Sequence, residues 1–351
     1  MSATDGRRAT LAAVAATAGV SISTVSKVLN GRTDVGPQTR ARIEELLAQF
    51  EYVGRRSEPG SRAGGQPIVE LVFHGRLVAY ALEVLQGVLD AAAEVGVGVV
   101  VSQRPRRPGG GEDSPAAWVR RLVAAGRTAV IDVVDDVLAG DLTVLSRARL
   151  PLVVIDPLNL PRTRTTSVGA TNFAGGLAAT QHLLSLGHRR IAYLGGIPGS
   201  SVNQARRHGY LAAMDAERAP VLEGYLRSGN FLYQDGLEEG LALLDLPEPP
   251  TAVFVASDES ATGVLEAARS RGLRVPRDLS VVGFDDTQVA RLVSPPLTTV
   301  RQPLREMGAV ALRTALRLAA GETLDSHHVE LATELVVRGS TGPPPEGQGA
   351  L

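Results

Sequence analysis

Seven short apolar runs, separated by segments of helical periodicity, constrain the fold of this chain most strongly. The runs are IVELVF (68–73), GVVVS (98–102), AVIDVV (129–134), LVVID (152–156), IAYLGG (191–196), AVFVAS (252–257) and LSVVGF (279–284). Continuously apolar strands that alternate with helices are typical of parallel sheets covered by helices on both faces. Helices are expected, for example, at 82–95, 172–186, 204–216, 258–271 and 304–320. The pattern predicts an α/β body of two lobes with a crevice between them, in which the first four strands form one lobe and the second begins near Asn172.

A much smaller unit is expected at the N-terminus, where three short helices can close one core. Thr10 is placed to cap a first helix that ends at Ala18, and Gly19 suits a tight turn. Ser21 is a good N-cap for a second helix, and a third follows Pro37, with an apolar stripe that ends at Phe50. Val25, Val28 and Leu29 point inward, whereas Ile22, Ser23 and Lys27 fall on the outward side of the second helix.

Such a three-helix unit is the usual form of a helix-turn-helix that reads DNA, although an alanine-rich helical hairpin gives a similar pattern. The run GVSISTVSKVLNG (19–31) resembles the headpiece motif of the LacI/GalR family of bacterial transcription regulators and lies, as in that family, at the extreme N-terminus. The resemblance implies a headpiece that binds double-stranded operator DNA. By that resemblance the base-facing residues are Ile22, Ser23 and Lys27, the phosphate-binding residues are Ser21 and Thr24, and Asn30 secures the backbone after the recognition helix.

The body of the chain resembles the same family. Three segments look like its effector domain, which is itself similar to periplasmic sugar-binding proteins: TNFAGGLAATQHLLSLGHRRIAYLGG, SDESATGVLEAARSRGLRVPRDLSVVGFDD and SPPLTTVRQPLREMG. The resemblance therefore covers nearly the whole chain. It implies a repressor that a small effector releases from a palindromic operator, although the sequence equally allows a corepressor that tightens binding.

Polar side chains at the strand ends indicate where an effector binds, because ligands of open α/β sheets bind at the carboxyl ends of the strands. Carboxylates, an amide and a guanidinium can satisfy the hydroxyl groups of a sugar, and an aromatic ring can cover its apolar face. The resemblance implies that Arg206 and Asp285 hold effector hydroxyls. The further candidates are Asn172, Asp258, Asp156 and the stacking residue Phe231.

Two of these candidates have an ordinary structural alternative. An aspartate at a strand end is often the N-cap of the next helix, which applies above all to Asp258, and Phe231 has the residue type of a core side chain. The effector class also stays open. We expect a monosaccharide or disaccharide, but the sequence does not exclude a nucleoside.

Composition and charge bound the remaining possibilities. The chain of 351 residues has no cysteine, 44% hydrophobic residues and no signal-peptide pattern or membrane-length apolar run, so we expect a cytoplasmic protein without a membrane partner. Its net charge of −1 says nothing about nucleic acid. The first 42 residues carry six basic and two acidic side chains, a local charge of +4, which is modestly favourable for phosphate binding, although codon bias toward arginine explains it as well.

No motif for catalysis, a cofactor or a metal stands out. The loop from Gly195 to Gly199 lacks the spacing of a dinucleotide or phosphate loop, and His327 and His328 have no further ligands at metal spacing and are expected in an exposed loop. The sequence therefore favours a regulator without a cofactor over an enzyme. A sugar-processing enzyme or solute buffer, with the N-terminal helices as an interaction module, is the alternative class.

The domain boundaries follow from these patterns. We expect a DNA-binding headpiece at 1–54, a hinge or linker at 55–67, an effector-binding and dimerisation domain at 68–340, and a flexible tail at 341–351. Relatives that form tetramers use a C-terminal leucine heptad, which this tail does not contain, so the resemblance implies a homodimer. Relatives carry a hinge helix that ends in a leucine wedged into the minor groove. Here Ser61 takes that position and Pro59 and the neighbouring glycines oppose a helix, so weaker operator kinking is expected.

Overall fold

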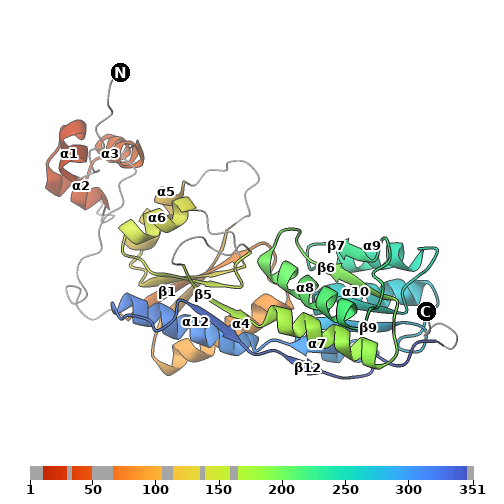
Figure 1. Cartoon of the computed structure of the whole chain (residues 1–351). Helices are drawn as coiled ribbons and strands as arrows, with labels where there is room; N and C mark the ends of the chain where they lie inside the picture. The colour runs from red at the N-terminus through yellow and green to blue at the C-terminus, as the bar shows by residue number, and fades with distance from the viewer. Residues whose placement is uncertain are drawn as a thin grey trace, which may run out of the picture.

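The computed structural model describes residues 11–29, 34–49, 66–104, 114–134, 139–158 and 165–345. At the N-terminus, α1 (Leu11–Ala18), α2 (Ile22–Leu29) and α3 (Pro37–Gln49) form the expected three-helix unit (Figure 1). Its core includes Val14, Val25 and Ile43, all fully buried. The predicted inward face of the second helix is therefore confirmed. Thr10, Asn30, Phe50 and the whole segment 51–65 lie outside the described residues.

The first lobe is built on a six-stranded parallel sheet with the strand order β11-β5-β4-β3-β1-β2. Because side chains alternate along a strand, Val69 and Leu71 of β1 pack under α4 and α12 on one face, and Val72 packs under α5 and α6 on the other. The strands are β1 (Ile68–His74), β2 (Gly98–Arg104), β3 (Ala129–Val133), β4 (Leu152–Ile155), β5 (Thr166–Ala170) and β11 (His328–Leu331). The helices are α4 (Ala79–Glu94), α5 (Pro115–Ala124), α6 (Ala139–Arg147) and α12 (Leu304–Ala319).

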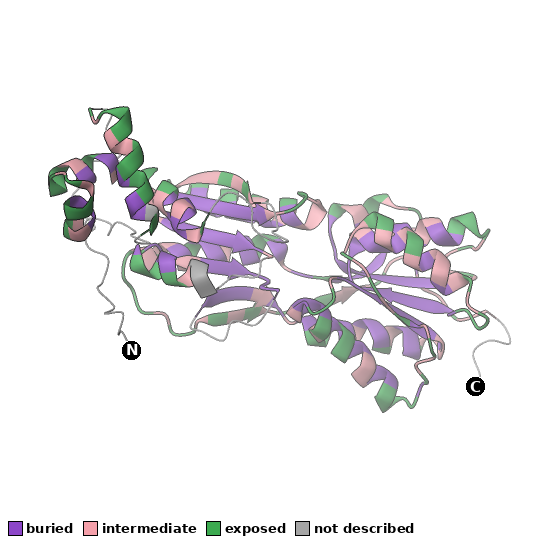
Figure 2. Cartoon of the chain, turned by 90° about the horizontal axis from the view of Figure 1, so that it is seen from above, coloured by how far each residue is buried: buried purple, intermediate pink, exposed green. Residues whose placement is uncertain are grey.

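The second lobe repeats this architecture with the strand order β12-β10-β9-β8-β6-β7, in which only β12 is antiparallel to its neighbour. Helices α7 and α8 cover one face and α9 and α10 the other, so the buried residues follow the strands of both sheets (Figure 2). The strands are β6 (Ile191–Gly195), β7 (Leu226–Ser228), β8 (Ala252–Val255), β9 (Ser280–Asp285), β10 (Thr298–Arg301) and β12 (Glu334–Val336). The helices are α7 (Asn172–Ser185), α8 (Ser201–Ala216), α9 (Tyr233–Leu244), α10 (Asp258–Ser270) and α11 (Gln288–Leu292).

The chain crosses between the two lobes three times rather than once near Asn172. It passes to the second lobe after β5, returns after β10 to form α12, and crosses again between β11 and β12. The first and third crossings are joined, because Thr171 Oγ1 lies 3.0 Å from Thr333 Oγ1 and accepts a hydrogen bond from the Thr333 amide. The last long helix therefore belongs to the first lobe, where its buried Met307 and Ala311 complete the core under α4.

The C-terminal segment differs from the expected flexible tail, which we placed at 341–351. The Gly342 amide donates to Ser280 Oγ at 3.0 Å, its carbonyl oxygen lies 2.9 Å from His188 Nε2, and Thr341 Oγ1 lies 3.1 Å from Thr298 Oγ1. These contacts attach the start of the segment to the second lobe, so the boundary at 341 is wrong. Residues 346–351 lie outside the described part of the chain.

Membrane-length helices were sought among the described residues. No single helix among them is long and apolar enough to cross a membrane. The helices α1 and α2, bent by 107° relative to each other, reach that length and apolar character only when they are taken together.

Candidate functional site

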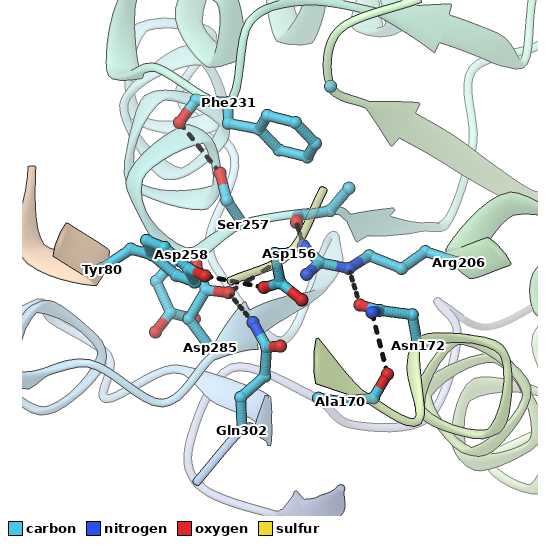
Figure 3. A network of polar contacts seen from close by, with 12 residues as sticks. Tyr80, Asp156, Ala170, Asn172, Arg206, Phe231, Ser257, Asp258, Asp285 and Gln302 are labelled. Atoms are coloured by element: carbon cyan, nitrogen blue, oxygen red, sulfur yellow. Dashed lines mark hydrogen bonds and ion pairs between the residues drawn. The ribbon is translucent and has the colours of Figure 1, made fainter. Parts of the chain in front are cut away.

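A cavity of about 230 Å³ lies between the two lobes and takes its walls from both of them. The first lobe contributes the ends of β1, β3 and β4 and the start of α4, and the second contributes α8, the segment 230–232, the start of α10 and the end of β9. Four of the six predicted effector residues lie on this wall, namely Asp156, Arg206, Phe231 and Asp285. Figure 3 shows that these side chains come together from separate elements.

Arg206 occupies the centre of the polar cluster and is held rigidly. Its Nε donates to Asn172 Oδ1 at 2.8 Å, its Nη1 donates to the Ala256 carbonyl at 2.6 Å, and its guanidinium lies 3.8 Å from the ring centre of Phe284. A Cβ atom at Gly176 would lie only 2.2 Å from the Arg206 carbonyl oxygen, so only glycine lets α7 and α8 approach this closely. Asn172 therefore serves the site by orienting Arg206 from the neighbouring helix.

Asp156 brings a carboxylate to the cavity from the first lobe. Tyr80, at the start of α4, donates its hydroxyl to Asp156 Oδ2 at 2.7 Å (Figure 3). The buried Oδ1 accepts no hydrogen bond of good geometry from the described residues, although the backbone of Ala170 also interacts with this carboxylate. Burial raises the pKa of Asp156, although the charge of Arg206 and the bond from Tyr80 oppose that rise. A buried acceptor without a well-formed hydrogen bond is costly, so this oxygen is suited to a ligand that donates a hydrogen bond.

Asp285 brings the second carboxylate, from the end of β9. It accepts a hydrogen bond from Gln302 Nε2 at 2.7 Å, and its Oδ1 lies 3.9 Å from Nη1 of Arg206. Burial raises its pKa to about 7, while Arg206 and Gln302 act in the opposite direction. Its backbone φ of 117° is strained for a residue other than glycine, as is common at ligand-binding sites. Gln302 lies in the second crossing between the lobes. The Asp285 carboxylate is therefore hydrogen-bonded directly to one of the segments that join the two lobes.

Two residues of this cluster, Tyr80 and Gln302, were missed by the sequence reasoning. Gln302 follows the strand TTVR directly, and the rule that polar residues at strand ends form ligand sites would have found it. Tyr80 lies in the first turn of α4, so no strand-end pattern marks it.

The polarity of the cavity changes along both sheets. In the first lobe, Asp156 at the end of β4 gives way to Val133 and Val134 at β3 and to Phe73 at β1. In the second lobe, Asp285 at β9 is followed by Ser257 after β8, Ile197 after β6, and Phe231 and Leu232 after β7. The carboxylates lie beside the lobe crossings, whereas the far end combines these apolar side chains with His74 at the end of β1, Arg76 after it and Asn230 after β7, an arrangement that fits a ligand with polar and apolar faces.

Phe231 lies on the cavity wall. It adopts a φ of 66°, and a Cβ atom at Gly196 would lie about 2.0 Å from its ring, so the glycine-rich loop after β6 makes room for this aromatic side chain. Its ring centre is 5.7 Å from the Arg206 guanidinium carbon. The ring can therefore cover the apolar face of a ligand held by the polar cluster.

Asp258 is not brought to the cavity, contrary to our expectation. Its Oδ2 accepts hydrogen bonds from the Thr287 amide and hydroxyl at 2.8 and 3.2 Å, and its Oδ1 accepts one from Thr299 at 2.6 Å. It is also not the N-cap of α10, because Ser257 accepts the capping hydrogen bond from the Ser260 amide. Asp258 is fully buried, and its carboxylate ties β10 and the loop after β9 to the start of α10.

The expected DNA-facing residues gather at α2. Ser21 Oγ lies 2.7 Å from Ser23 Oγ and 2.8 Å from Thr24 Oγ1, and it accepts a hydrogen bond from the Thr24 amide at 3.1 Å, which confirms it as the N-cap. Ile22 is 51% exposed although it is large and apolar. Lys27 is also exposed and forms an ion pair with Asp34.

The described residues contain no group of three His, Cys, Asp or Glu side chains that could hold a metal ion. The expectation of an exposed loop holds in part for the two adjacent histidines: His328 is exposed but belongs to β11, and His327 lies in the loop directly before that strand and is half-buried. His327 Nδ1 lies 3.1 Å from Thr166 Oγ1 and His328 Nδ1 lies 3.0 Å from Ser167 Oγ, because β11 pairs with β5.

Comparison with known proteins agrees with both the headpiece and the body. Residues 10–54 match the model of bacterial regulatory proteins of the lacI family, and residues 180–341 match that of a periplasmic binding protein-like domain. The chain is 33% identical over 353 residues to the HTH-type transcriptional regulator CelR of Thermobifida fusca, covering 95% of this chain and 98% of that protein. It is 30% identical over 329 residues to catabolite control protein A of Priestia megaterium, covering 93% and 98%.

Solved structures show the same relationship. A complex of the regulator CelR with cellobiose matches with a TM-score of 0.68 and 32% identity, over 95% of this chain and 100% of that one. The lac repressor dimer bound to operator and the anti-inducer ONPF matches with a TM-score of 0.69 and 27% identity, over 96% and 100%. The fold is thus that of a helix-turn-helix headpiece joined to a two-lobed binding-protein-like body. The chain belongs to the lacI family of bacterial regulatory proteins, whose members regulate transcription.

Proposed function

We propose that this protein is a homodimeric, cytoplasmic repressor that binds a palindromic operator and releases it when a small polyhydroxylated effector enters the crevice between the lobes. The observation that carries the effector role is the cluster of Asp156, Arg206 and Asp285, which joins both lobes around a buried carboxylate oxygen, Asp156 Oδ1, that accepts no hydrogen bond of good geometry from the described residues. Because the chain crosses the lobes three times, a ligand that contacts both lobes alters their relative arrangement.

The effector we propose is a monosaccharide or disaccharide. Hydroxyl groups can donate to Asp156 and Asp285 and accept from Arg206, and Phe231 covers the apolar face of the ring. The cellobiose complex of the related CelR supports this class. A nucleoside also combines hydroxyls with a flat apolar face and is the alternative that a screen must include.

Dimerisation follows from the need to read two half-sites, because one headpiece contacts only a few base pairs. Apolar side chains on α4 and β2 support a partner surface on the first lobe. Leu82 and Leu89, seven residues apart on α4, are 48% and 40% exposed, and Val101 of β2 is 43% exposed. We place the headpiece at 1–54, the linker at 55–67 and the effector and dimerisation domain from 68 onward. Weaker operator kinking through the linker remains a proposal.

In the two-state mechanism, one arrangement of the lobes holds both headpieces at half-site spacing and the other does not. An effector that binds the second arrangement more tightly releases the DNA. Linkage then requires that bound DNA lowers the affinity for the effector by the same factor by which the effector lowers the affinity for DNA. We propose this inducer role, and a corepressor, which prefers the first arrangement and tightens DNA binding, is the alternative. The protein acts through binding, and we assign it no catalytic step.

The proposal is tested by a thermal-shift screen of sugars, including cellobiose, and of nucleosides. A compound at about 100 times its Kd should stabilise the protein by roughly 2.7 kcal/mol. Arg206→Lys keeps the charge but loses the guanidinium geometry, so the stabilisation should largely disappear, while affinity for a duplex selected from a random library stays intact. An unchanged stabilisation in Arg206→Lys, or release of DNA by none of the compounds, contradicts the proposal.

A further inference from the structure

An acidic side chain lies beside the outward face of α2, where DNA is expected to bind. Asp34 Oδ2 accepts a hydrogen bond from Lys27 Nζ at 2.7 Å, across a sequence separation of seven residues. The two side chains are 54% and 50% exposed. Lys27 lies one turn after Ser23 on the same face of the helix, so Asp34 belongs to the surface that carries the predicted base contacts.

The position of this carboxylate is not explained by stability or by general affinity for DNA. Exposed ion pairs contribute little to folding stability, because water screens them and ordering two long side chains costs entropy. A carboxylate at a DNA-binding surface also opposes the attraction of phosphates, which supplies most of the non-specific affinity. Its place beside the predicted base contacts instead points to a contribution to specificity.

The pair presents a donor and an acceptor next to each other. The ammonium group of Lys27 has three donors, of which one is directed to Asp34, and the carboxylate of Asp34 offers only acceptors. In the major groove, guanine presents the acceptors N7 and O6, followed by the N4 amino donor of its paired cytosine. An A·T pair presents acceptor, donor and acceptor instead, so two adjacent acceptors beside a donor occur only at G·C.

We propose that Lys27 and Asp34 act together as a reader of one G·C base pair in each half-site. Lys27 donates to N7 and O6 of the guanine, and Asp34 accepts from the N4 amino group of the paired cytosine. Asp34 also restrains the flexible lysine and keeps it from the phosphates, toward which an unrestrained ammonium group turns readily. This inference rests on the proposed function, in which α2 enters the major groove.

A second ion pair in the same headpiece provides a matched control. Arg40 and Glu44 lie on α3 with their charged atoms 3.9 Å apart, and the Glu44 side chain is exposed to a similar extent as Asp34. Glu44→Gln and Asp34→Asn remove the same charge from the headpiece. Only Asp34→Asn weakens the acceptor that is hydrogen-bonded to the recognition helix, because a neutral amide with a single acceptor oxygen replaces the carboxylate.

The experiment selects binding sites from a random duplex library with the full-length wild type, Asp34→Asn, Asp34→Glu and Glu44→Gln. The wild type should select half-sites with one fixed G·C position, discriminated by roughly 5- to 150-fold over the other base pairs. Asp34→Asn should lose most of this preference, and Asp34→Glu, which keeps the acceptor, should recover part of it. Glu44→Gln should keep the wild-type preference. Thermal unfolding of all four proteins checks that they fold equally.

Salt dependence gives an independent readout on a non-selected duplex. If the freed Lys27 turns to a phosphate in Asp34→Asn, the slope of log K against log salt concentration should become steeper by about 0.9, and non-specific affinity should rise. Base preferences in Asp34→Asn that match those of Glu44→Gln would overturn the inference while leaving DNA binding intact. A wild type that selects no common half-site would contradict the proposed function itself.

Discussion

Three buried aspartates near the strand ends of the two lobes have the same side chain and different surroundings. Both oxygens of Asp258 accept hydrogen bonds from Thr287 and Thr299. Asp156 receives one bond from Tyr80 and keeps an oxygen that accepts no hydrogen bond of good geometry from the described residues, and Asp285 lines the cavity beside Arg206. Burial therefore does not separate a structural carboxylate from a ligand-binding one. Asp258 differs from Asp156 in that the protein itself fills its acceptor positions, and it differs from Asp285 in that Asp285 lies on the cavity wall.

The largest effect in this comparison is expected for the stability of Asp258→Ala. The substitution leaves the Thr287 amide and two threonine hydroxyls without their acceptor in a buried site, at about 1–3 kcal/mol for each orphaned group. The free energy of unfolding should fall by about 3 kcal/mol or more, as measured by urea denaturation. Asp156→Ala should cost clearly less. Equal losses in the two variants would remove the distinction that we draw between these carboxylates.

The next effect concerns effector affinity. Asp285→Asn and Asp156→Asn keep the shape of the side chain but replace acceptor oxygens that a ligand hydroxyl needs. We expect each to weaken binding of the compound found in the screen by about 1.5–3 kcal/mol, the range for hydrogen bonds to charged groups. Isothermal titration calorimetry measures this loss. Asp258→Asn, in a protein that remains folded, serves as the control and should change the affinity by less than about threefold.

The pKa of Asp285 predicts a smaller, pH-dependent effect. Burial raises this pKa to about 7, and hydroxyl groups donate best to the ionised carboxylate. Effector affinity should therefore level off above about pH 7 and fall below it, by up to about tenfold per pH unit. In the same range, the free energy of unfolding should decrease as the pH rises from about 4 toward 7, because the folded state retains a proton that the unfolded state releases.

Calorimetry of the wild type and Asp285→Asn at several pH values checks this prediction. The variant lacks the titrating group and should show a flatter profile. Parallel profiles in the two proteins would mean that another group, such as Asp156, whose pKa is also raised by burial, causes the pH dependence.

The smallest effect is expected for Tyr80→Phe. The change removes one hydrogen bond to Asp156 Oδ2 and keeps the aromatic ring. The binding free energy of the effector should therefore become less favourable by about 0.5–1.5 kcal/mol. A competition titration can resolve this difference. A loss as large as that of Asp156→Asn would show instead that the tyrosine contacts the ligand directly.

The sequence predicts the body well where its strands are long and apolar. All seven predicted strands are present as β1, β2, β3, β4, β6, β8 and β9, with ends that differ by at most two residues. The strands that were not predicted lack the apolar run that marks these seven: β5 (TSVGA), β7 (LRS), β10 (TTVR), β11 (HVEL) and β12 (ELV). Periodicity also cannot tell which sheet a helix covers, so the return of α12 to the first lobe was not predictable.

The site was predicted less completely, for a physical reason. Asp156, Asp285 and Asp258 were all predicted as effector ligands because each lies at a strand end. Only the hydrogen bonds from Thr287 and Thr299, which the sequence does not reveal, show that the protein itself occupies the acceptor oxygens of Asp258. Tyr80 reaches the cavity because the start of α4 lies beside the end of β4 in space, as its hydrogen bond to Asp156 shows, although 76 residues separate these two side chains in the chain. Contacts between distant segments decide the role of each side chain.

The central claim is that the crevice cluster controls DNA binding by holding a hydroxylated effector. The most direct measurement is the affinity for the selected duplex with and without a saturating concentration of the compound found in the screen, in the wild type and in Asp285→Asn. We predict that the compound weakens DNA binding of the wild type by at least about tenfold, a coupling free energy of about 1.4 kcal/mol, and that of the variant by less than about twofold at the same concentration. Equal weakening in both proteins would contradict the account.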